Sequence, residues 1–222
     1  MLPAPSPDHP ERQARRALIR GVYAITADEG DTTRLLAGVE AALSGGVRIL
    51  QYRNKHADMA LKRQQLEALK PVCERHQALL IVNDDWRLAA ELGIKAVHLG
   101  EDDGDIEEAR RTLGPGALIG VSCYASVERA RALAPVADYL AFGALFASGT
   151  KPLARPAPLS VFREVQALSL ARPLVGIGGI DADNIGSVLA AGADAAAVIG
   201  SLFRQGDVRA AAQRLVTAAA RP

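Results

Sequence analysis

Side chains suited to binding phosphate lie at the end of an apolar run that begins near residue 49. There the chain reads Gln51-Tyr52-Arg53-Asn54-Lys55. Alternate residues of an extended segment share a face, so Gln51, Arg53 and Lys55 can converge on one side. Arginine offers a planar fork of donors and lysine a compact charge, and both suit a polyphosphate. The segment therefore predicts a polyphosphate contact, although basic residues in an ordinary solvated loop would have the same composition.

Acidic residues follow the next two apolar runs. Asn83-Asp84-Asp85 ends one run, and the other continues from His98 through Gly100-Glu101-Asp102-Asp103. Asn and Asp are favoured at helix N-caps, which could explain either run alone. Carboxylates that face one cavity repel each other unless a proton or a cation intervenes, and a hard oxygen site suits Mg²⁺. The two runs together predict a magnesium site, and His98 could point inward as a donor or serve only as a structural histidine.

Three further segments carry features of anion sites. Ser148, Thr150 and Lys151 lie in a connection of Pro and small residues, 146–158, which lacks the upstream glycine pattern of a Walker A loop. Because long connections in compact domains are often functional, this segment is a candidate lid. The runs 176–180 (GIGGI) and 198–201 (VIGS) each follow a late apolar run, and glycine lets backbone N–H groups approach a phosphate closely. They predict a monophosphate site, although the glycines could also serve only a tight turn.

Eight apolar runs alternate with amphipathic stretches, which predicts parallel strands joined by helices. The expected strands are 22–26, 49–52, 79–83, 96–99, 118–122, 139–143, 174–177 and 195–199, and the expected helices are 32–44, 58–76, 85–92, 105–113, 126–134, 158–170, 183–191 and 207–220. An open doubly wound sheet fits the same pattern. A single (β/α)8 TIM barrel is favoured because nearly every polar signature follows the carboxyl end of a strand, where barrel sites form. The barrel should span 21–222, after an N-terminal arm with a short helix at 1–20.

Composition excludes several classes of partner. Lys and Arg total 26 against 25 Asp and Glu, so the charge of the whole chain predicts no nucleic-acid or membrane partner. The two cysteines form no metal or disulfide pattern, no targeting segment is evident, and a reduced, cytoplasmic setting is expected. A homo-oligomer is compatible with the sequence, which does not specify one.

From about Gly21 to Phe203 the chain resembles the thiamine phosphate synthases. The family's ordered motifs are Gln-x-Arg-x-Lys, Asn-Asp, His-x-Gly-Gln-x-Asp, Gly-Val-Ser, Thr-x-Thr-Lys and Gly-Ile-Gly-Gly-Ile. They are matched at 51–55, 83–84, 98–103, 120–122, 148–151 and 176–180. Glu101 replaces the usual Gln, Ser148 replaces the first Thr, and Gly200 stands where some relatives carry Ser.

The resemblance implies a Mg²⁺-dependent transferase. It would condense 4-amino-2-methyl-5-hydroxymethylpyrimidine diphosphate with 4-methyl-5-(2-phosphoethyl)thiazole. By that resemblance the metal ligands are Asp84 and Asp103. The diphosphate ligands are Arg53, Lys55, Asn83, Ser122 and Lys151, of which Arg53, Lys55, Ser122 and Lys151 are the catalytic set. Gln51 and His98 would approach the pyrimidine, and the thiazole phosphate would bind Ser148, Thr150, Gly179, Ile199 and Gly200.

Two alternatives accompany this expectation. A thiazole tautomerase is a related barrel that uses a histidine shortly after strand five, where this chain has Ser122-Cys123-Tyr124-Ala125. A non-catalytic barrel that only binds phosphorylated ligands is the other. Retention of both expected metal carboxylates favours the synthase over either one.

Overall fold

The eight expected strands form a closed parallel barrel in a computed structural model that describes residues 9–147 and 156–220. The strands are β1 (Gly21–Ile25), β2 (Ile49–Tyr52), β3 (Leu79–Asn83), β4 (Ala96–Leu99), β5 (Leu118–Tyr124), β6 (Tyr139–Phe142), β7 (Leu174–Ile177) and β8 (Ala195–Val198). Each strand pairs with the next in sequence, and β8 pairs with β1 to complete the circle. The (β/α)8 barrel is confirmed, and the open doubly wound sheet is excluded.

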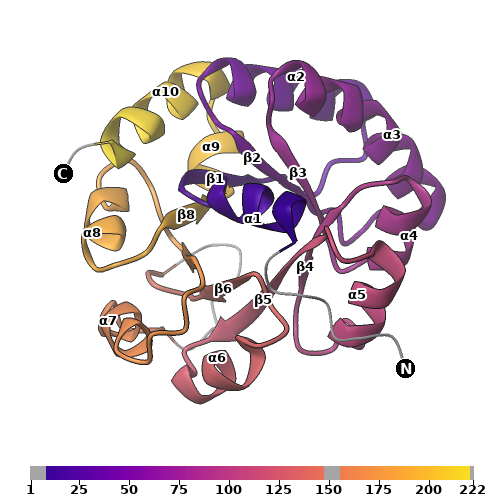
Figure 1. The fold of residues 1–222 in the computed structure, drawn as a ribbon. Helices are drawn as coiled ribbons and strands as arrows, with labels where there is room; N and C mark the ends of the chain where they lie inside the picture. Colours follow the sequence, from indigo (N-terminus) through magenta and orange to yellow (C-terminus); the bar gives the residue numbers. More distant parts are fainter. Residues whose placement is uncertain (1–8, 148–155, 221–222) are drawn as a thin grey trace.

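The helices form a ring outside the barrel (Figure 1). In chain order the helices are α1 (Pro10–Ala17), which lies outside this ring, α2 (Thr32–Ser44), α3 (Met59–Arg75), α4 (Trp86–Glu91), α5 (Ile106–Leu113), α6 (Val127–Leu133), α7 (Ser160–Gln166), α8 (Ile185–Ala190), α9 (Gly200–Phe203) and α10 (Val208–Ala219). Side-chain caps start several of them: Asp31, for example, accepts hydrogen bonds from the backbone N–H groups of Thr33 and Arg34. The short helix α9 has no counterpart among the expected helices. Nowhere in 9–147 or 156–220 does a helix combine the length and hydrophobicity needed to cross a bilayer.

Two hydrophobic layers follow from the alternation of strand side chains. The outer layer packs between the sheet and the helices. The inner layer fills the barrel and is made largely of small or branched residues, among them Ala195 and Ala197 on β8. Two large polar side chains, Tyr23 and Tyr139, also belong to this inner layer and are 1% and 0% exposed. They become the floor of the cavity described below.

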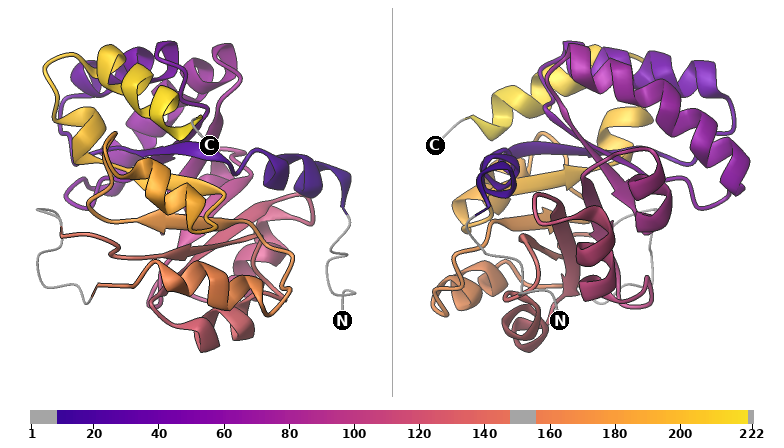
Figure 2. Two further views of the ribbon diagram at one scale, coloured as in Figure 1. Left: turned by 90° about the vertical axis from the view of Figure 1, so that its left-hand side faces the viewer. Right: turned by 45° about the vertical axis from the view of Figure 1, so that its right-hand side comes forward.

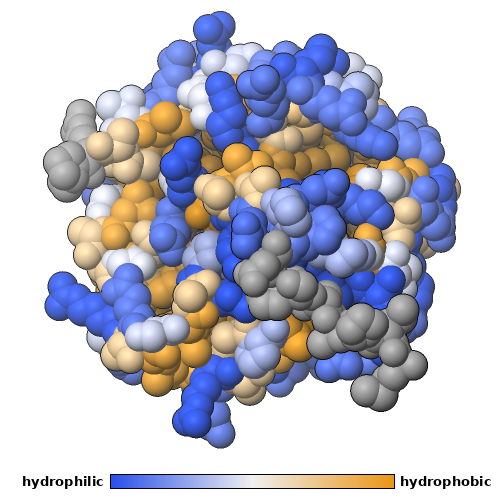
Figure 3. All heavy atoms as spheres, viewed as in Figure 1, coloured by the Kyte–Doolittle hydropathy of each residue, from blue (hydrophilic) through white to orange (hydrophobic). Residues whose placement is uncertain are grey.

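Helix α1 lies across the end of the barrel where the strands begin (Figures 1 and 2). It is attached by a buried charge cluster. Asp138, which is fully buried just before β6, pairs with Arg12, with Arg16 (2.9 Å) and with Arg110 of α5 (2.6 Å). The backbone N–H of Ile119 donates a fourth hydrogen bond to the same carboxylate. The face that carries α1 is otherwise a mosaic of hydrophilic and hydrophobic residues (Figure 3).

The pKa of Asp138 depends on its burial and on the groups that contact it. Burial alone would raise it, but the charge and hydrogen bond of Arg110, with help from the Ile119 N–H, hold the pKa below its usual range. A depressed carboxyl pKa stabilises the folded state above the unfolded pKa of about 3.9, and this stabilisation is lost as the pH falls through the folded value.

Replacing Asp138 with Asn should therefore lower the free energy of unfolding by about 3–5 kcal/mol at neutral pH, because it leaves buried guanidinium groups without a counter-charge. Urea denaturation monitored by circular dichroism measures the loss. Glu108→Gln is the matched control: it removes an exposed ion pair with Arg87 and should cost less than about 1 kcal/mol. Equal losses in the two variants would contradict the assigned role of the cluster.

Candidate active site

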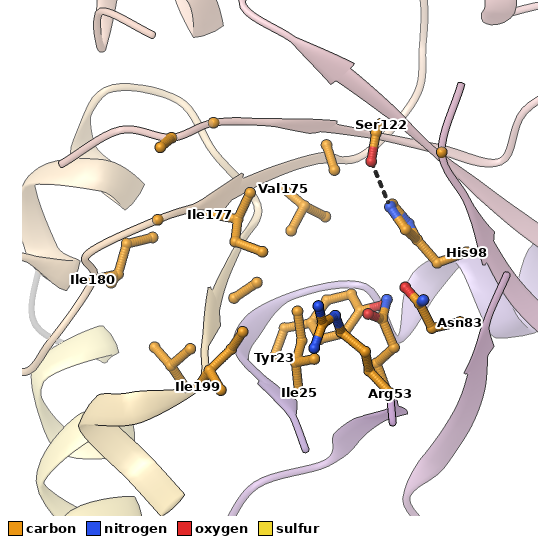
Figure 4. Close-up of a pocket in the computed structure, with 18 of the residues that line it drawn as sticks. Tyr23, Ile25, Arg53, Asn83, His98, Ser122, Val175, Ile177, Ile180 and Ile199 are labelled. Atoms are coloured by element: carbon orange, nitrogen blue, oxygen red, sulfur yellow. Dashed lines mark hydrogen bonds between the residues drawn. The ribbon is translucent and has the colours of Figure 1, made fainter. Parts of the chain in front are cut away.

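The opposite end of the barrel holds a cavity of about 990 Å³, lined by residues from the carboxyl ends of the strands and the loops that follow. Cavities of this size accommodate drug-sized ligands, so two small substrates can fit side by side. Polar side chains, including Arg53, Asn83, His98 and Ser122, gather on one side (Figure 4). Branched apolar side chains of β7, β8 and their loops, such as Ile177, face them. The cavity is thus divided between a polar side and an apolar side.

Arg53 is held at the polar side by its own loop and by the loop after β1. The Thr26 hydroxyl donates to the Arg53 carbonyl and accepts from the Arg53 N–H, both at 2.8 Å. The carboxylate of Asp28 accepts from the Arg53 guanidinium at 3.2 and 3.3 Å and from the Lys55 N–H at 2.6 Å. Asp28 is absent from the predicted site because its sequence context, an acidic loop, carries no distinguishing signal. It orients the guanidinium that the sequence predicts to contact a polyphosphate.

Asp84 and Asp103 meet at the same rim, and both line the cavity. Burial, together with a hydrogen bond and negative charge from Asp103, raises the pKa of Asp84 to about 6. Lys55 offsets part of this shift from 3.7 Å. The backbone of Asp84 is left-handed (φ 63°), an unusual conformation for a residue other than Gly and common at functional sites. The two carboxylates repel each other when both are ionised, and a bound cation would reduce that repulsion.

The donor set suits Mg²⁺, which binds through one or two carboxylates and the phosphates of its substrate. In the described ranges no three His, Cys, Asp or Glu side chains cluster as a metal site, so an ion held by Asp84 and Asp103 would depend on the substrate phosphates for further ligands. Glu101 turns to Arg129 instead, at 3.5 Å, and its side chain is 60% exposed. Glu101, the carboxylate that stands in place of the usual Gln, is thereby paired with a cation at the rim.

Ser122 and His98 belong to a hydrogen-bonded chain that crosses the barrel interior. Ser122 Oγ lies 2.9 Å from His98 Nε2, and His98 Nδ1 lies 3.0 Å from the Tyr139 hydroxyl. Tyr139 and Tyr23 share a hydrogen bond of 2.8 Å, and Gln51 Nε2 donates to Tyr23 at 2.8 Å. The dashed line in Figure 4 marks the first of these contacts. The sequence indicates Gln51, His98 and Ser122 separately, whereas the two tyrosines that connect them lie in apolar runs and carry no such signal.

The glycine-rich loops after β7 and β8 form the far rim. Gly179 adopts a positive φ of 63°, and a side chain there would approach the Ala147 carbonyl oxygen to 2.5 Å. Glycine is therefore required for the turn as well as for access to backbone. Gly200 begins α9, whose first N–H groups have no partner within the helix, and Ile199 precedes it at the cavity wall. Arg204, one turn further on, also lines the cavity and was not among the predicted residues.

The remaining predicted residues are Ser148, Thr150 and Lys151, which lie outside the described residues, as does most of the candidate lid 146–158. All the other predicted site residues line this one cavity. Fold and site together define an α/β-barrel enzyme whose single cavity has a cationic rim at β2 and a glycine-rich rim at β7 and β8.

Comparison with known proteins specifies the family. The family model described as thiamine monophosphate synthase matches residues 22–202. A thiamine-phosphate synthase of Chromobacterium violaceum is 52% identical over 198 residues, which cover 89% of this chain and 95% of the relative. A thiamine-phosphate synthase of Methylobacillus flagellatus is 50% identical over 197 residues, 88% and 93% of the two chains. The solved thiamine phosphate pyrophosphorylase from Pyrococcus furiosus superposes with a TM-score of 0.81 at 32% identity, covering 92% of this chain and 97% of that one.

The chain belongs to the thiamine monophosphate synthase family. The resemblance drawn from the ordered motifs is thereby confirmed.

The raised pKa of Asp84 predicts how stability depends on pH. The folded protein binds a proton here between the unfolded pKa of about 3.9 and the folded value, so this contribution to stability is present at low pH and lost as the pH rises through about 6. Asp84→Asn removes the repulsion, and asparagine tolerates the left-handed backbone. At pH 8 without divalent cations the variant should be more stable than the parent by about 1 kcal/mol, a value discounted for partial exposure.

Urea denaturation at pH 5 and pH 8 measures the effect, and the gain should shrink at the lower pH. Asp102→Asn removes the same charge from an exposed neighbour and serves as the control. A variant at position 84 that is less stable than the parent at pH 8 would contradict the carboxylate repulsion.

Proposed function

We propose that this barrel transfers a pyrimidinylmethyl group from its diphosphate to the ring nitrogen of a thiazole phosphate. The substrates would be 4-amino-2-methyl-5-hydroxymethylpyrimidine diphosphate and 4-methyl-5-(2-phosphoethyl)thiazole, and the products thiamine phosphate and diphosphate. A single observation carries the proposal: one cavity has two separate rims suited to anions, one cationic at β2 and one of glycine backbone at β7 and β8. A reaction between a diphosphate and a monophosphate requires that arrangement.

The diphosphate would lie on the polar side. Arg53 and Lys55 face this side beside the Asp84–Asp103 pair, and Asn83 and Ser122 supply neutral polar groups. Mg²⁺ held by the two carboxylates would neutralise charge on the leaving diphosphate. Arg53 pairs with Asp28, and Lys55 pairs with Asp84. The incoming diphosphate would therefore replace these carboxylates as the partner of the two cations.

The reaction would begin with cleavage of the bond between the pyrimidine methylene carbon and the diphosphate oxygen. The diphosphate departs with the electron pair, and the aminopyrimidine ring stabilises the cation that remains. The thiazole nitrogen then forms the new C–N bond with its lone pair, so no proton has to be removed in this step. The role of the protein is to stabilise charge that develops on the leaving group, a task for fixed donors such as Arg53.

The apolar side suits the neutral thiazole. Ile177, Ile180 and Ile199 can cover the ring while its phosphate reaches the N–H groups near Gly179 and Gly200. An apolar wall would also keep water away from the cation, which water would otherwise trap.

The thiazole tautomerase alternative lacks the histidine that it would use shortly after strand five. The corresponding stretch here is Ser122-Cys123-Tyr124-Ala125. Its Cys123 is fully buried, and burial raises the pKa of the thiol to about 12. Tyr124, its neighbour, is exposed at the rim beside Arg129. The barrel that binds without catalysis differs from the proposal only in forming no product.

Purified protein should convert the two substrates into thiamine phosphate, detected by fluorescence after oxidation to thiochrome. Product formation should require both substrates, stop with EDTA and resume on addition of excess Mg²⁺. Binding of both ligands without product would favour the non-catalytic barrel. Product that persists through EDTA treatment would leave the transferase intact and contradict the role given to the two carboxylates.

Arg204 should bind the thiazole phosphate, because it places a cation at the glycine rim, where the phosphate carries close to two negative charges. Arg204→Ala should raise the KM for the thiazole phosphate about tenfold, the effect of losing one charge-assisted hydrogen bond, and leave kcat nearly unchanged. Arg204→Lys should restore part of the loss. Initial rates at varied thiazole phosphate measure the effect, with Arg163→Ala on the surface of α7 as the control. A fall in kcat with unchanged KM would contradict this assignment.

A further inference from the structure

Two tyrosines that have no part in the proposed reaction lie at the centre of the barrel. The Tyr23 and Tyr139 hydroxyls are buried, hydrogen-bonded to each other, and located between Gln51 on one wall and His98 on the other. Burial raises the pKa of both hydroxyls well above its ordinary value, so both stay protonated. Each therefore has one proton to donate and can accept from others.

Because both phenols are buried, each phenol proton must be donated within the chain, and only two directions of the chain meet that requirement. If Gln51 donates to Tyr23, then Tyr23 donates to Tyr139 and Tyr139 donates to His98 Nδ1. A neutral His98 then carries its proton on Nε2 and donates to Ser122 Oγ, and the Ser122 proton is left to point into the cavity. If the Gln51 amide is turned over, every donor and acceptor is exchanged, and Ser122 gives its proton to His98 instead.

The structure places Gln51 Nε2, the donor, 2.8 Å from the Tyr23 hydroxyl. We infer that Tyr23 and Tyr139 are positioning residues that hold His98 in the Nε2–H tautomer and so direct the Ser122 hydroxyl proton at the substrate diphosphate. The inference deepens the proposed function, because the role of the Ser122 proton rests on a diphosphate binding at the polar side. The direction of the hydrogen-bonded chain is a property of the free protein and does not depend on the proposed function.

The surroundings of Tyr139 support a dedicated position for its ring. Gly120, its partner in the register of β5 and β6, has no side chain, and a Cβ there would fall within the Tyr139 ring. The His98 ring stacks against the same phenol, with centroids 5.6 Å apart and planes inclined by 26°. The ring is thus fixed from both sides, with its hydroxyl between His98 and Tyr23.

The same direction orients Gln51. With its amide nitrogen bonded to Tyr23, its carbonyl oxygen remains to accept a hydrogen bond at the cavity, where the residue is part of the lining. An acceptor at this place suits the exocyclic amino group of an aminopyrimidine and disfavours a hydroxypyrimidine in its keto form, which presents an acceptor of its own. One chain would therefore set both the recognition of the pyrimidine at one end and the donor to the diphosphate at the other.

The tautomer of His98 tests the inference without any substrate. The chain has four histidines, so replacing His9, His56 and His76 with Asn leaves His98 as the sole imidazole in protein made without a histidine tag. Its two ¹⁵N chemical shifts at pH 8 distinguish a protonated from an unprotonated ring nitrogen. We expect Nε2 protonated and Nδ1 unprotonated. The opposite tautomer, or an imidazolium with both nitrogens protonated, would overturn the inference.

A variant adds a second readout. Tyr139→Phe removes the donor to His98 Nδ1, so the ¹⁵N shifts should move toward a mixture of the two tautomers. Tyr52→Phe is the matched control, because it deletes another buried tyrosine hydroxyl, one that donates to Gln65 outside the chain. The control should keep the Nε2–H tautomer, and unchanged shifts in Tyr139→Phe would overturn the positioning role.

Steady-state kinetics then distinguishes a positioning role of Tyr139 from a general disturbance of the active site. Tyr139→Phe should lower kcat about tenfold, as expected for one misdirected hydrogen bond. Because Tyr139 acts through Ser122, the double variant Tyr139→Phe, Ser122→Ala should be no slower than Ser122→Ala alone. Losses that multiply would show that Tyr139 acts by another route and would overturn the inference. If the parent protein forms no thiamine phosphate, the proposed function fails, whereas the ¹⁵N measurement still decides the tautomer.

Discussion

The hydrogen bond between the Tyr23 and Tyr139 hydroxyls is the contact on which the organisation of this cavity depends. Buried polar groups need hydrogen-bond partners, and here those partners come from across the barrel interior. Two phenols fill the space that the small residues of β8 leave open and close the barrel below the cavity. Their hydroxyls also join Gln51 on β2 to His98 on β4, and through His98 to Ser122 on β5. A single buried network thereby fixes side chains from five strands.

Above these two tyrosines, the order of the strands separates the charged side of the cavity from the apolar side. The carboxyl ends of adjacent parallel strands bring Arg53 and Lys55 next to Asp84 and Asp103, although about 50 residues separate the first from the last. The far side of the cavity carries glycine backbone and branched apolar residues (Figure 4). The closed order of strands therefore produces two chemically different sides of one cavity, which is what a reaction between two phosphorylated substrates needs.

The sequence predicts the fold well because each strand and helix is marked by residues that lie close together in the chain. Continuous apolar runs and capping residues place the strands within one or two residues. β5 extends two residues beyond the expected end, to Tyr124, and its register shifts between Ser122 and Tyr124. The polar site residues are predictable for a similar reason, since a polar group after an apolar strand marks the site end of a barrel.

The sequence does not predict contacts between distant segments. Tyr23 and Tyr139 are separated by 116 positions, and Arg12 and Asp138 by 126, so neither pairing has a local signal. Asp28 and Arg204 lie in ordinary charged loops, and only the closed barrel shows that one faces Arg53 and the other the glycine rim. What the sequence leaves undetermined is thus the set of residues that orient the chemically active ones.

The central claim is that the two phosphate-bearing substrates occupy opposite sides of one cavity. A crystal structure with Mg²⁺, inorganic diphosphate and the thiazole phosphate bound together tests it most directly. We expect diphosphate between Arg53 and the Asp84–Asp103 pair, with the thiazole phosphate at Gly179 and Gly200. A thiazole phosphate bound beside Arg53, or a diphosphate at the glycine rim, would contradict it.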